Sequence, residues 1–421
     1  MVGMSFLVLV VSLLCCKKDF NVVAGGLKSG AEASVVMVIG VCVFFFMSHS
    51  WMFFFFFFEL ALIPTLWLIL TWGYQPERLQ AGMFMMMYTS CASMPLMIIL
   101  LWMVSSVGSD KFLLVKLLGG SFTLLGSVNS FCWFFLVLGF LVKLPVYLFH
   151  SWLPKAHVEA PLSGSMLLAG VLLKLGGFGL CRVLWLVEIN VSPFVSFILV
   201  SSVWGGLLCS CFCFCQGDLK ALVAYSSVGH MSLCLCGVFS FFSCGWSGVK
   251  IMMFCHGLCS PMLFCLVAVL YELSHSRSVG LNKGLLTVIP SFAFFWCCFC
   301  MVNMGFPVSL NFISEVVLIS SSKGISFYLL PVFGLMSFVT GGYCFYMYGA
   351  VSHGSLSSDL VISNCLSERH MYGGVFCLVI LMLSFPGLDF FFYVFNFSLM
   401  VHSSVQMSFS LNTSTSLWNK G

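Results

Sequence analysis

Charged side chains are scarce in this chain. Asp, Glu, Lys and Arg make up only 7% of its 421 residues, and 61% of the residues are hydrophobic. Ordinary soluble domains carry about 25% charged residues. The formal net charge of +4 comes from scattered residues and indicates no nucleic-acid partner. The shortage therefore excludes a soluble globular domain and predicts a surface that is covered by lipid.

Motifs for redox cofactors are also missing from the sequence. No strand–GxGxxG–helix unit is present to bind a nicotinamide nucleotide, because the GGFG at Gly176–Gly179 falls inside an apolar run. No set of cysteines has the spacing that ligates an iron–sulfur cluster. We therefore expect the chain to bind no cofactor and to carry out no redox chemistry itself.

The 22 cysteines lie inside apolar runs and do not form metal-binding patterns. Cys297 and Cys300 make a CxxC, but no second pair or histidine pair completes a tetrahedral site. The series Cys209, Cys211, Cys213 and Cys215 points successive side chains to opposite sides of a helix. We interpret the cysteines as small apolar side chains and expect no metal site.

Long apolar runs are what the chain has in abundance. A membrane-spanning helix needs about 20 apolar residues, whereas a membrane β-barrel would show alternating segments of about ten. Runs such as Phe53–Phe58 are apolar on every face, so we predict an all-α integral membrane protein with about twelve spans. The first two runs are short, and no signal peptide is evident. The predicted spans are Met4–Cys16, Ser34–Met47, Trp51–Trp72, Gly82–Val104, Phe131–Phe149, Ser163–Val187, Pro193–Cys215, Leu219–Phe242, Ser247–Tyr271, Leu285–Ser320 with an interruption, Ile325–Ala350 and Tyr372–Phe395.

No linker divides the chain into separate domains. We expect a shortened N-terminal membrane region over residues 1–50 and an antiporter-like core over residues 51–350. Residues 351–421 are predicted to hold a connecting segment, a final helix and a Ser-rich tail. The mixed-polarity stretch Ser105–Ser130 is predicted to hold a short interfacial helix.

Successive loops of a chain with many spans lie on alternate sides of the membrane, and lysine and arginine are shared unequally between the two sides. Basic loops stay on the side of the membrane where the chain is made. We therefore predict that the Tyr74–Gln80 loop lies on that side, which is the matrix in a mitochondrion, and that the N-terminus lies on the other. The larger set is Lys17, Lys18, Lys28, Arg78, Lys155, Lys220, Arg277, Lys283 and Arg369, and the smaller set is Lys111, Lys116, Arg182, Lys323 and Lys420.

Two apolar runs are interrupted by proline close to an ionisable residue. Lys143 comes just before Pro145, and Pro307 lies on the N-terminal side of Glu315. Paired broken helices in two halves of a chain are typical of transporters built from inverted repeats. The pattern predicts antiporter-like inverted repeats with two broken helices.

Ionisable residues inside apolar runs cost several kcal/mol unless they are paired or hydrated, so each is a functional candidate. The alternatives are a structural ion pair, a side chain that snorkels to the interface, or a simple hydrogen bond for a histidine. Snorkelling is favoured for Lys250, which lies near the start of its run. Lys174 lies deep inside its run, which favours function. The candidates are Glu59, Lys143, Lys174, His230, His256 and Glu315.

These residue types suit a path for protons. Burial disfavours the charged form of lysine and of glutamate, whereas a nearby opposite charge favours it. A lysine whose glutamate moves away can therefore release a proton, and histidine suits proton relay near neutral pH. Broken helices leave backbone groups free to line a hydrated cavity.

Five segments of the sequence resemble one family of membrane subunits. The most distinctive, at Leu141–Leu180, is LVKLPVYLFHSWLPKAHVEAPLSGSMLLAGVLLKLGGFGL. GYQPERLQAG precedes it, and QGDLKALVAYSSVGHMSL, HGLCSPMLFCL and YELSHSR follow it. In this order the segments are similar to chain 4 of mitochondrial NADH–ubiquinone oxidoreductase, which is respiratory complex I, over about Phe44–Phe385.

The resemblance implies roles for the candidate residues. The wider group includes cation/proton antiporters and the sister chains 2 and 5 of the same complex. By resemblance to it, Glu59 and Lys143 are the coupled acid–lysine pair, and Lys174 is the central lysine.

The other three candidates take their roles from the same resemblance. His230 and His256 are similar to the hydrated histidines of the central axis. Glu315 resembles the terminal residue of the half-channel, where chain 4 carries glutamate and the sister chains typically carry lysine.

The family implies proton transfer from the matrix to the intermembrane space, driven by quinone reduction elsewhere in the complex. NADH, FMN, iron–sulfur clusters and ubiquinone would then be used by other subunits. The implied partners are chains 2 and 5, accessory subunits and the lipid of the mitochondrial inner membrane. Abundant Phe, Val, Gly and Cys, whose codons are rich in T and G, also favour an organelle genome.

The N-terminal region departs from the family pattern. The family usually has fourteen spanning helices, and Glu59 comes about two helices early, so the first helices are expected to be missing. Two alternatives stay open. One is a stand-alone cation/proton antiporter of the same fold, and the other is a structural subunit that does not pump.

Overall fold

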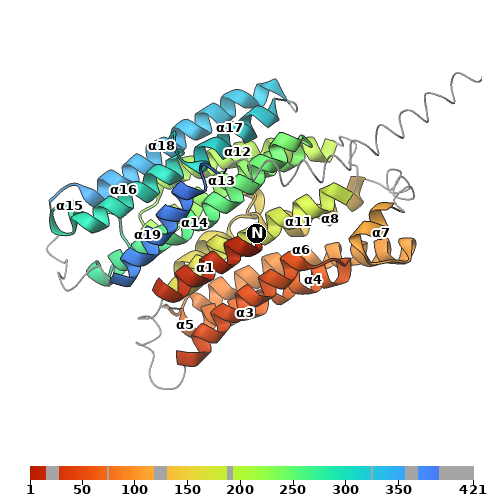
Figure 1. Cartoon of the computed structure of the whole chain (residues 1–421), viewed down its shortest axis with the longest axis horizontal. Helices are drawn as coiled ribbons and strands as arrows, with labels where there is room; N and C mark the ends of the chain where they lie inside the picture. Colours follow the sequence, from red (N-terminus) through yellow and green to blue (C-terminus); the bar gives the residue numbers. More distant parts are fainter. Residues whose placement is uncertain are drawn as a thin grey trace, which may run out of the picture.

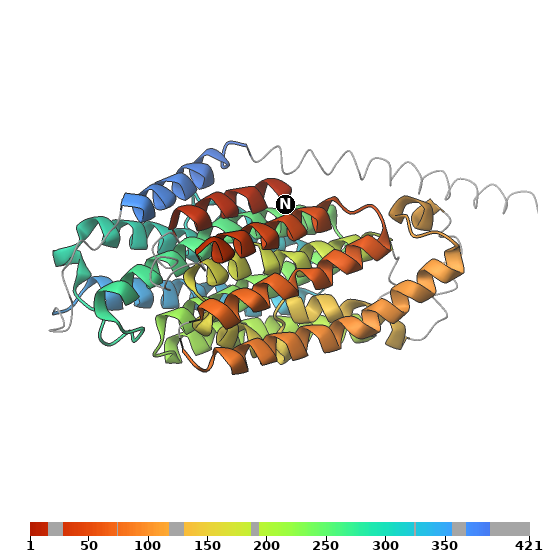
Figure 2. The ribbon, with the colours of Figure 1, turned by 90° about the horizontal axis from the view of Figure 1, so that it is seen from below.

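The computed structural model describes residues 1–15, 28–73, 75–117, 130–186, 193–323, 326–355 and 368–387. Within these ranges every regular element is a helix, apart from isolated β-bridges that join Ser50 to Lys111 and Asp218 to Ser278. The helices run side by side and form an elongated bundle (Figures 1 and 2). The prediction of an all-α membrane protein is confirmed.

Eight stretches of the described chain are long and apolar enough to cross a membrane, and shorter apolar helices accompany them. These stretches and helices correspond to the predicted spans. The last predicted span, Tyr372–Phe395, overlaps α19 in its first part. The helices of four or more residues are α1 (Val2–Cys15), α3 (Lys28–Met47), α4 (Trp51–Leu60), α5 (Leu62–Trp72), α6 (Arg78–Val107), α7 (Phe112–Leu117), α8 (Ser130–Lys143), α9 (Trp152–Glu159), α10 (Leu162–Leu167), the π-helix η3 (Leu168–Leu172), α11 (Leu173–Leu186), α12 (Pro193–Cys215), α13 (Leu219–Phe239), α14 (Ser243–Ser274), α15 (Leu285–Val288), α16 (Pro290–Met304), α17 (Leu310–Ser322), α18 (Leu330–Ser352) and α19 (Glu368–Leu383).

Several boundaries differ from the predicted ones. The second span is not short, because α3 begins at Lys28 and not at Ser34. Hydropathy misses these first residues since they are polar, yet Lys, Ala and Glu are good helix formers. The span predicted over Phe131–Phe149 is interrupted where the proline predicts it, because α8 ends at Lys143. Pro145 follows, and proline has no amide hydrogen to continue the helical hydrogen bonds.

Two spans are broken near their middle, as predicted. After α8 ends at Lys143, the short 3-10 helix η2 covers Tyr147–Phe149 and α9 begins at Trp152. The other break separates Met304 from Leu310. From α3 onward, and leaving out the short helices α7 and α15, the spans form two sets of five. In each set the fourth span is the broken one. The first set is α3, α4–α5, α6, α8–α9 and α10–α11, and the second set is α12, α13, α14, α16–α17 and α18. The repeated order is what two inverted repeats produce.

The first and last described helices lie side by side (Figure 1). The Nε2 atom of His370 in α19 is 3.1 Å from the backbone oxygen of Cys15 at the end of α1. The short helix predicted within Ser105–Ser130 is present as α7. The polar connection before Arg369 and the Ser-rich tail fall mostly outside the described residues. On α12, Cys209 and Cys213 are buried whereas Cys211 and Cys215 are exposed, as their spacing predicts.

The two ends of the bundle carry different basic residues. We call one the His49 end, where His49, Asp110, Arg182 and Trp246 line a common pocket. We call the other the Arg277 end, defined by Arg277, Glu159, Lys155 and Glu77. The helices join these ends alternately, so the sequence-based division of the loops into two sets is correct for these residues.

The topology can be tested with epitope tags inserted after Glu77 and after Lys323. We expect the Glu77 tag in the compartment where the chain is made, because the Arg277 end carries more lysine and arginine. Antibody access in intact and in opened membrane vesicles measures the side of each tag. The Lys323 tag is the control and should give the opposite result. Access to the Glu77 tag from the opposite side of sealed vesicles of known orientation would contradict the predicted orientation.

Candidate functional site

Four of the six candidate side chains form a buried row in the centre of the bundle. They are Lys174 of α11, His256 of α14, His230 of α13 and Glu315 of α17, and we call them the central row. Their exposed fractions are 0%, 2%, 0% and 6%. Each comes from a different helix, so the packing of four spans brings them together.

The row begins at Lys174. Its Nζ atom donates to the backbone oxygen of Ala169 and lies 3.0 Å from Nδ1 of His256. Ala169 lies in the π-helix that precedes α11. A π-turn shifts the hydrogen-bonding register of the helix, which changes the partners of nearby carbonyl groups. The π-helix thus supplies a backbone acceptor for a lysine that has no access to solvent.

The row continues through the two histidines to Glu315. The ring centroids of His230 and His256 are 5.5 Å apart. Nδ1 of His230 is 3.5 Å from Oε1 of Glu315. Among the described residues, Nε2 of His230 and Nε2 of His256 lack a hydrogen-bond partner. Buried polar atoms of this kind are usually satisfied by ordered water.

The Glu315 carboxylate lies next to the break between α16 and α17. Gly305 ends α16 with a φ of 77°, which only glycine adopts readily. A Cβ atom at this position would lie 2.9 Å from Oε2 of Glu315. From α17, the side-chain amide of Asn311 donates to Oε1 of Glu315 at 3.1 Å and to the backbone oxygen of Asn303 at 3.2 Å. The broken helix therefore positions the acid at the end of the row.

The remaining candidates, Glu59 and Lys143, form a second group. Lys143 is 4% exposed although it lies at a helix end, because that end is inside the bundle. Its Nζ atom donates to the backbone oxygen of Phe58 at 2.5 Å and lies 3.3 Å from the centroid of the Phe58 ring. The ion pairs among the described residues do not include Glu59 with Lys143. Oε1 of Glu59 is buried without a hydrogen-bond partner among those residues, so the acid and the lysine are neighbours that are not in direct contact.

Glycine brings the two groups close together. At Gly176, a Cβ atom would lie 2.8 Å from the backbone nitrogen of Leu144 and 3.1 Å from the backbone oxygen of Phe140. Helix α11, which carries Lys174, therefore packs backbone to backbone against the broken end that carries Lys143. The GGFG motif therefore has a packing role here.

Comparison with known proteins identifies the family. Residues 48–341 match the family model described as NADH:quinone oxidoreductase/Mrp antiporter, TM. NADH-ubiquinone oxidoreductase chain 4 of Albinaria caerulea is 43% identical over 83% of this chain and 78% of the relative. The chain 4 of Locusta migratoria is 45% identical over 70% of this chain and 65% of the relative. This chain belongs to the NADH-ubiquinone oxidoreductase chain 4 family.

Solved structures share the fold of this chain 4 family member. A chain of respiratory complex I from Thermus thermophilus matches with a TM-score of 0.80 at 21% identity, over 93% of this chain and 83% of that chain. A chain of the Mrp complex from Dietzia sp. DQ12-45-1b matches with a TM-score of 0.79 at 15% identity, over 92% and 81%. All six candidate residues lie inside the region that the family model covers.

Sequence reasoning missed a polar group between the central row and the Arg277 end. His157 is fully buried and its ring stacks on Phe264 with centroids 4.6 Å apart. Nearby, Glu159 and Arg277 form an ion pair at 3.7 Å, and the Nζ atom of Lys220 donates to the backbone oxygen of Ala160 at 3.2 Å. His157 and Glu159 belong to the Leu141–Leu180 segment that resembled chain 4. They were not predicted because they do not lie in the middle of an apolar run.

Gly305 offers a test of how the Glu315 site is built. We expect Gly305→Ala to lower the free energy of unfolding by about 1–2 kcal/mol, because a left-handed conformation is costly for residues with a Cβ atom. The added methyl group would also press on the Glu315 carboxylate. The midpoint of thermal denaturation in detergent measures the effect. The control is Gly334→Ala in α18, where a Cβ atom meets nothing within 4 Å. Equal stability of the two variants would contradict the proposed constraint.

Proposed function

We propose that this chain translocates protons across the mitochondrial inner membrane as an antiporter-like subunit of NADH:ubiquinone oxidoreductase. The observation that carries the proposal is the central row. A lysine, two histidines and a glutamate lie in sequence inside an apolar bundle, and intramembrane ionisable residues of this kind mark ion and proton pathways. Because the chain belongs to the chain 4 family, we propose that this transfer takes place in that complex.

In the proposed path, protons pass along the central row in short steps. Protonated Lys174 gives a proton to Nδ1 of His256, which lies 3.0 Å away. The histidine rings are too far apart for a direct hydrogen bond, and water bound to their unpartnered nitrogens would bridge them. His230 then passes the proton to Glu315, whose Oε1 is 3.5 Å from Nδ1. The row thus has a donor at one end and an acceptor at the other.

Glu59 and Lys143 act as a switch in this proposal. Lys143 is at the end of a broken helix and is held by the Phe58 carbonyl and ring. Glu59 follows Phe58 directly, so a small movement of the lysine would bring it to the acid. Near the acid the ammonium form is stabilised, and away from it burial favours release of the proton. Release would be toward Lys174, whose helix contacts the same broken end.

The polar group at the Arg277 end supports a route by which protons arrive. A pocket of about 230 Å³ at this end is lined by Glu77, Lys155 and Glu159. His157 lies between this group and the central row. We propose that His157 and Glu159 extend the path toward the face that carries the Glu77 loop.

The remaining assignments follow from the family. We propose that the chain carries no redox centre, and that NADH, FMN, iron–sulfur clusters and ubiquinone are used by other subunits. Chains 2 and 5 are the proposed neighbours in the mitochondrial inner membrane, together with accessory subunits and lipid. Exposed large apolar side chains on α6 and α18, such as Met83, Ile98, Leu335 and Phe338, provide surface for such contacts.

The two alternatives have less support. A stand-alone antiporter would share the fold. However, the matched chain of the Mrp complex is 15% identical to this chain, whereas the chain 4 of Locusta migratoria is 45% identical to it. A structural subunit that does not pump would have no need for four buried titratable side chains in a row. Burying them costs several kcal/mol, which makes intramembrane ionisable residues functional candidates by default.

Lys174→Ala tests the relay. We expect the variant complex to assemble, because removing a buried ammonium leaves no unpaired charge, and to pump protons about 10²-fold more slowly, since a positioned proton-transfer group is lost. Blue-native electrophoresis with an NADH dehydrogenase stain measures assembly, and proton uptake by vesicles measures pumping. Lys283→Ala is the control, because Lys283 is exposed. Normal pumping by an assembled Lys174→Ala complex would rule out the relay.

The switch predicts that Glu59 and Lys143 are energetically coupled. Glu59→Gln should impair turnover, and Glu59→Asp should be milder because it keeps the charge. In a double-mutant cycle with Lys143→Met, we expect a coupling energy above about 0.5 kcal/mol, the limit for independent sites. Rates of turnover coupled to pumping give the four corners of the cycle. Simple additivity of the two single variants would mean that no switch connects the two side chains.

A further inference from the structure

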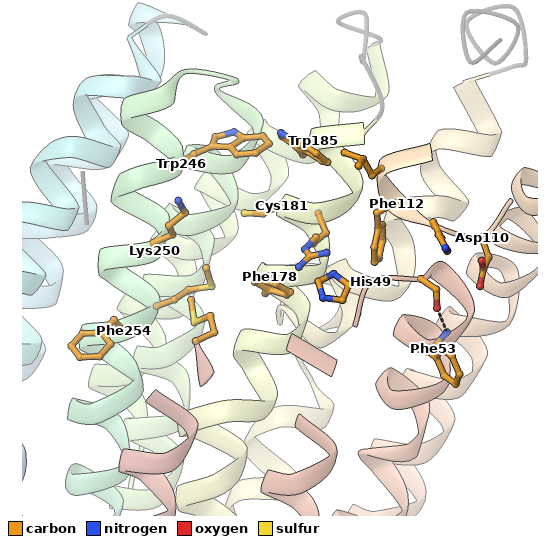
Figure 3. Close-up of a pocket in the computed structure, with 16 residues that line it drawn as sticks. His49, Phe53, Asp110, Phe112, Phe178, Cys181, Trp185, Trp246, Lys250 and Phe254 are labelled. Atoms are coloured by element: carbon orange, nitrogen blue, oxygen red, sulfur yellow. Dashed lines mark hydrogen bonds between the residues drawn. The ribbon is translucent and has the colours of Figure 1, made fainter. Parts of the chain in front are cut away.

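A large pocket opens at the His49 end, away from the central row. Its volume is about 1000 Å³, at the upper end of the range for ligand cavities. The walls come from the start of α4, from α7, and from the facing ends of α11 and α14 (Figure 3). None of the six candidate residues lines it.

The pocket has an excess of cations. Among the described residues, Lys111, Arg182 and Lys250 line it together with one acid, Asp110. The guanidinium carbon of Arg182 lies 4.9 Å from the Phe112 ring centroid and 5.1 Å from the Phe178 ring centroid. Two aromatic rings therefore hold the guanidinium group in position.

The hydrogen bonding of Arg182 leaves donors for a ligand. Among the described residues its hydrogen bond goes to the backbone oxygen of Ser48, at a long 3.4 Å. A guanidinium group has five N–H donors in one plane, an arrangement that matches the oxygens of a phosphate. Arg182 is therefore arranged to bind a phosphate oxygen from within the pocket.

The rest of the lining is mostly apolar and aromatic. Trp185 and Trp246 lie toward the end of the bundle, whereas Lys250 lies further in on α14, and Phe254 still further in (Figure 3). Tryptophan near a helix end is typical of the level of the lipid headgroups. The pocket thus passes from tryptophan through cations to a phenylalanine-lined interior, which is the order of polarity along a phospholipid.

We infer that this pocket binds one anionic phospholipid, with its phosphate at Arg182 and an acyl chain along Phe178 and Phe254. A free inorganic anion would not need the apolar interior. A neutral lipid or a quinone would not need three cations against one acid. Lys250 is then a headgroup ligand and does not merely snorkel to the interface. The inference does not depend on the proton path.

Photo-crosslinking of the purified complex tests this site. The complex is reconstituted into phosphatidylcholine liposomes that contain phosphatidylglycerol with a photoactivatable group in one acyl chain. We expect adducts in the peptides that contain Phe178 and Phe254, competed by unlabelled phosphatidylglycerol and not by phosphatidylcholine. In Arg182→Gln, the adduct yield should be about tenfold lower, the loss expected for a hydrogen bond to a charged group.

Two further variants keep the result interpretable. Lys323→Gln removes an exposed cation from the same end of the bundle and should leave the adduct yield unchanged. If Arg182→Gln fails to assemble on a blue-native gel, Lys250→Gln takes its place and should reduce the yield several-fold. Equal yields in wild type and in assembled pocket variants would overturn the proposal. Equal competition by phosphatidylcholine, or a pocket filled by protein in the complex, would also overturn it.

Discussion

A lysine with no exposed surface lies at the centre of this apolar bundle, and much of the structure depends on satisfying it. An ammonium group in such surroundings costs several kcal/mol unless polar partners surround it. Lys174 finds them in the Ala169 carbonyl and in His256. The first requires the π-helix, and the second requires α14 to approach closely. Gly257 permits that approach, because a Cβ atom there would lie 3.2 Å from the backbone oxygen of Gly170 and 3.5 Å from Cε of Lys174.

The same requirement explains the irregular helices. A regular α-helix uses all of its interior backbone groups and has none to offer to a buried charge. Irregular backbone lies beside three ionisable residues: the π-helix offers the Ala169 carbonyl to Lys174, α8 ends at Lys143, and the break before Glu315 leaves the Asn303 carbonyl to accept from Asn311. Since irregular backbone at membrane depth is tolerated only where it faces protein or water, these sites lie inside the bundle.

Two kinds of cationic site result, and they differ in chemistry. Lys143 and Lys174 are buried, and their partners among the described residues are carbonyl oxygens, a phenylalanine ring and a histidine. Arg182 is fixed between two aromatic rings near the end of the bundle. A lysine suits proton transfer because it can lose its proton, whereas an arginine stays charged and suits the binding of an anion. The residue types are thus divided between the interior and the end of the bundle in accordance with their chemistry.

Much of this architecture could be predicted from the sequence, because it depends on local composition. Apolar runs determine the spans, Pro145 and Pro307 mark the two breaks, and the isolated charges identify Glu59, Lys143, Lys174 and Glu315 as candidates. The start of α3 was misplaced because hydropathy does not register polar residues that continue a helix. The π-helix before Lys174 leaves no signal in composition, since its residues are ordinary apolar ones.

The sequence by itself therefore determined the class of protein, the order of its spans and the residue types available for proton transfer. Only the tertiary structure decided which of them meet. Lys174 and His256 are 82 residues apart, and Lys143 and the Phe58 carbonyl are 85 apart. The same holds for the position of His157 and for the cationic pocket around Arg182, whose walls come from separate helices. Contacts of this kind depend on how closely two helices can pack. That closeness is set by the glycines and side chains of both helices together, so it cannot be read from either segment alone.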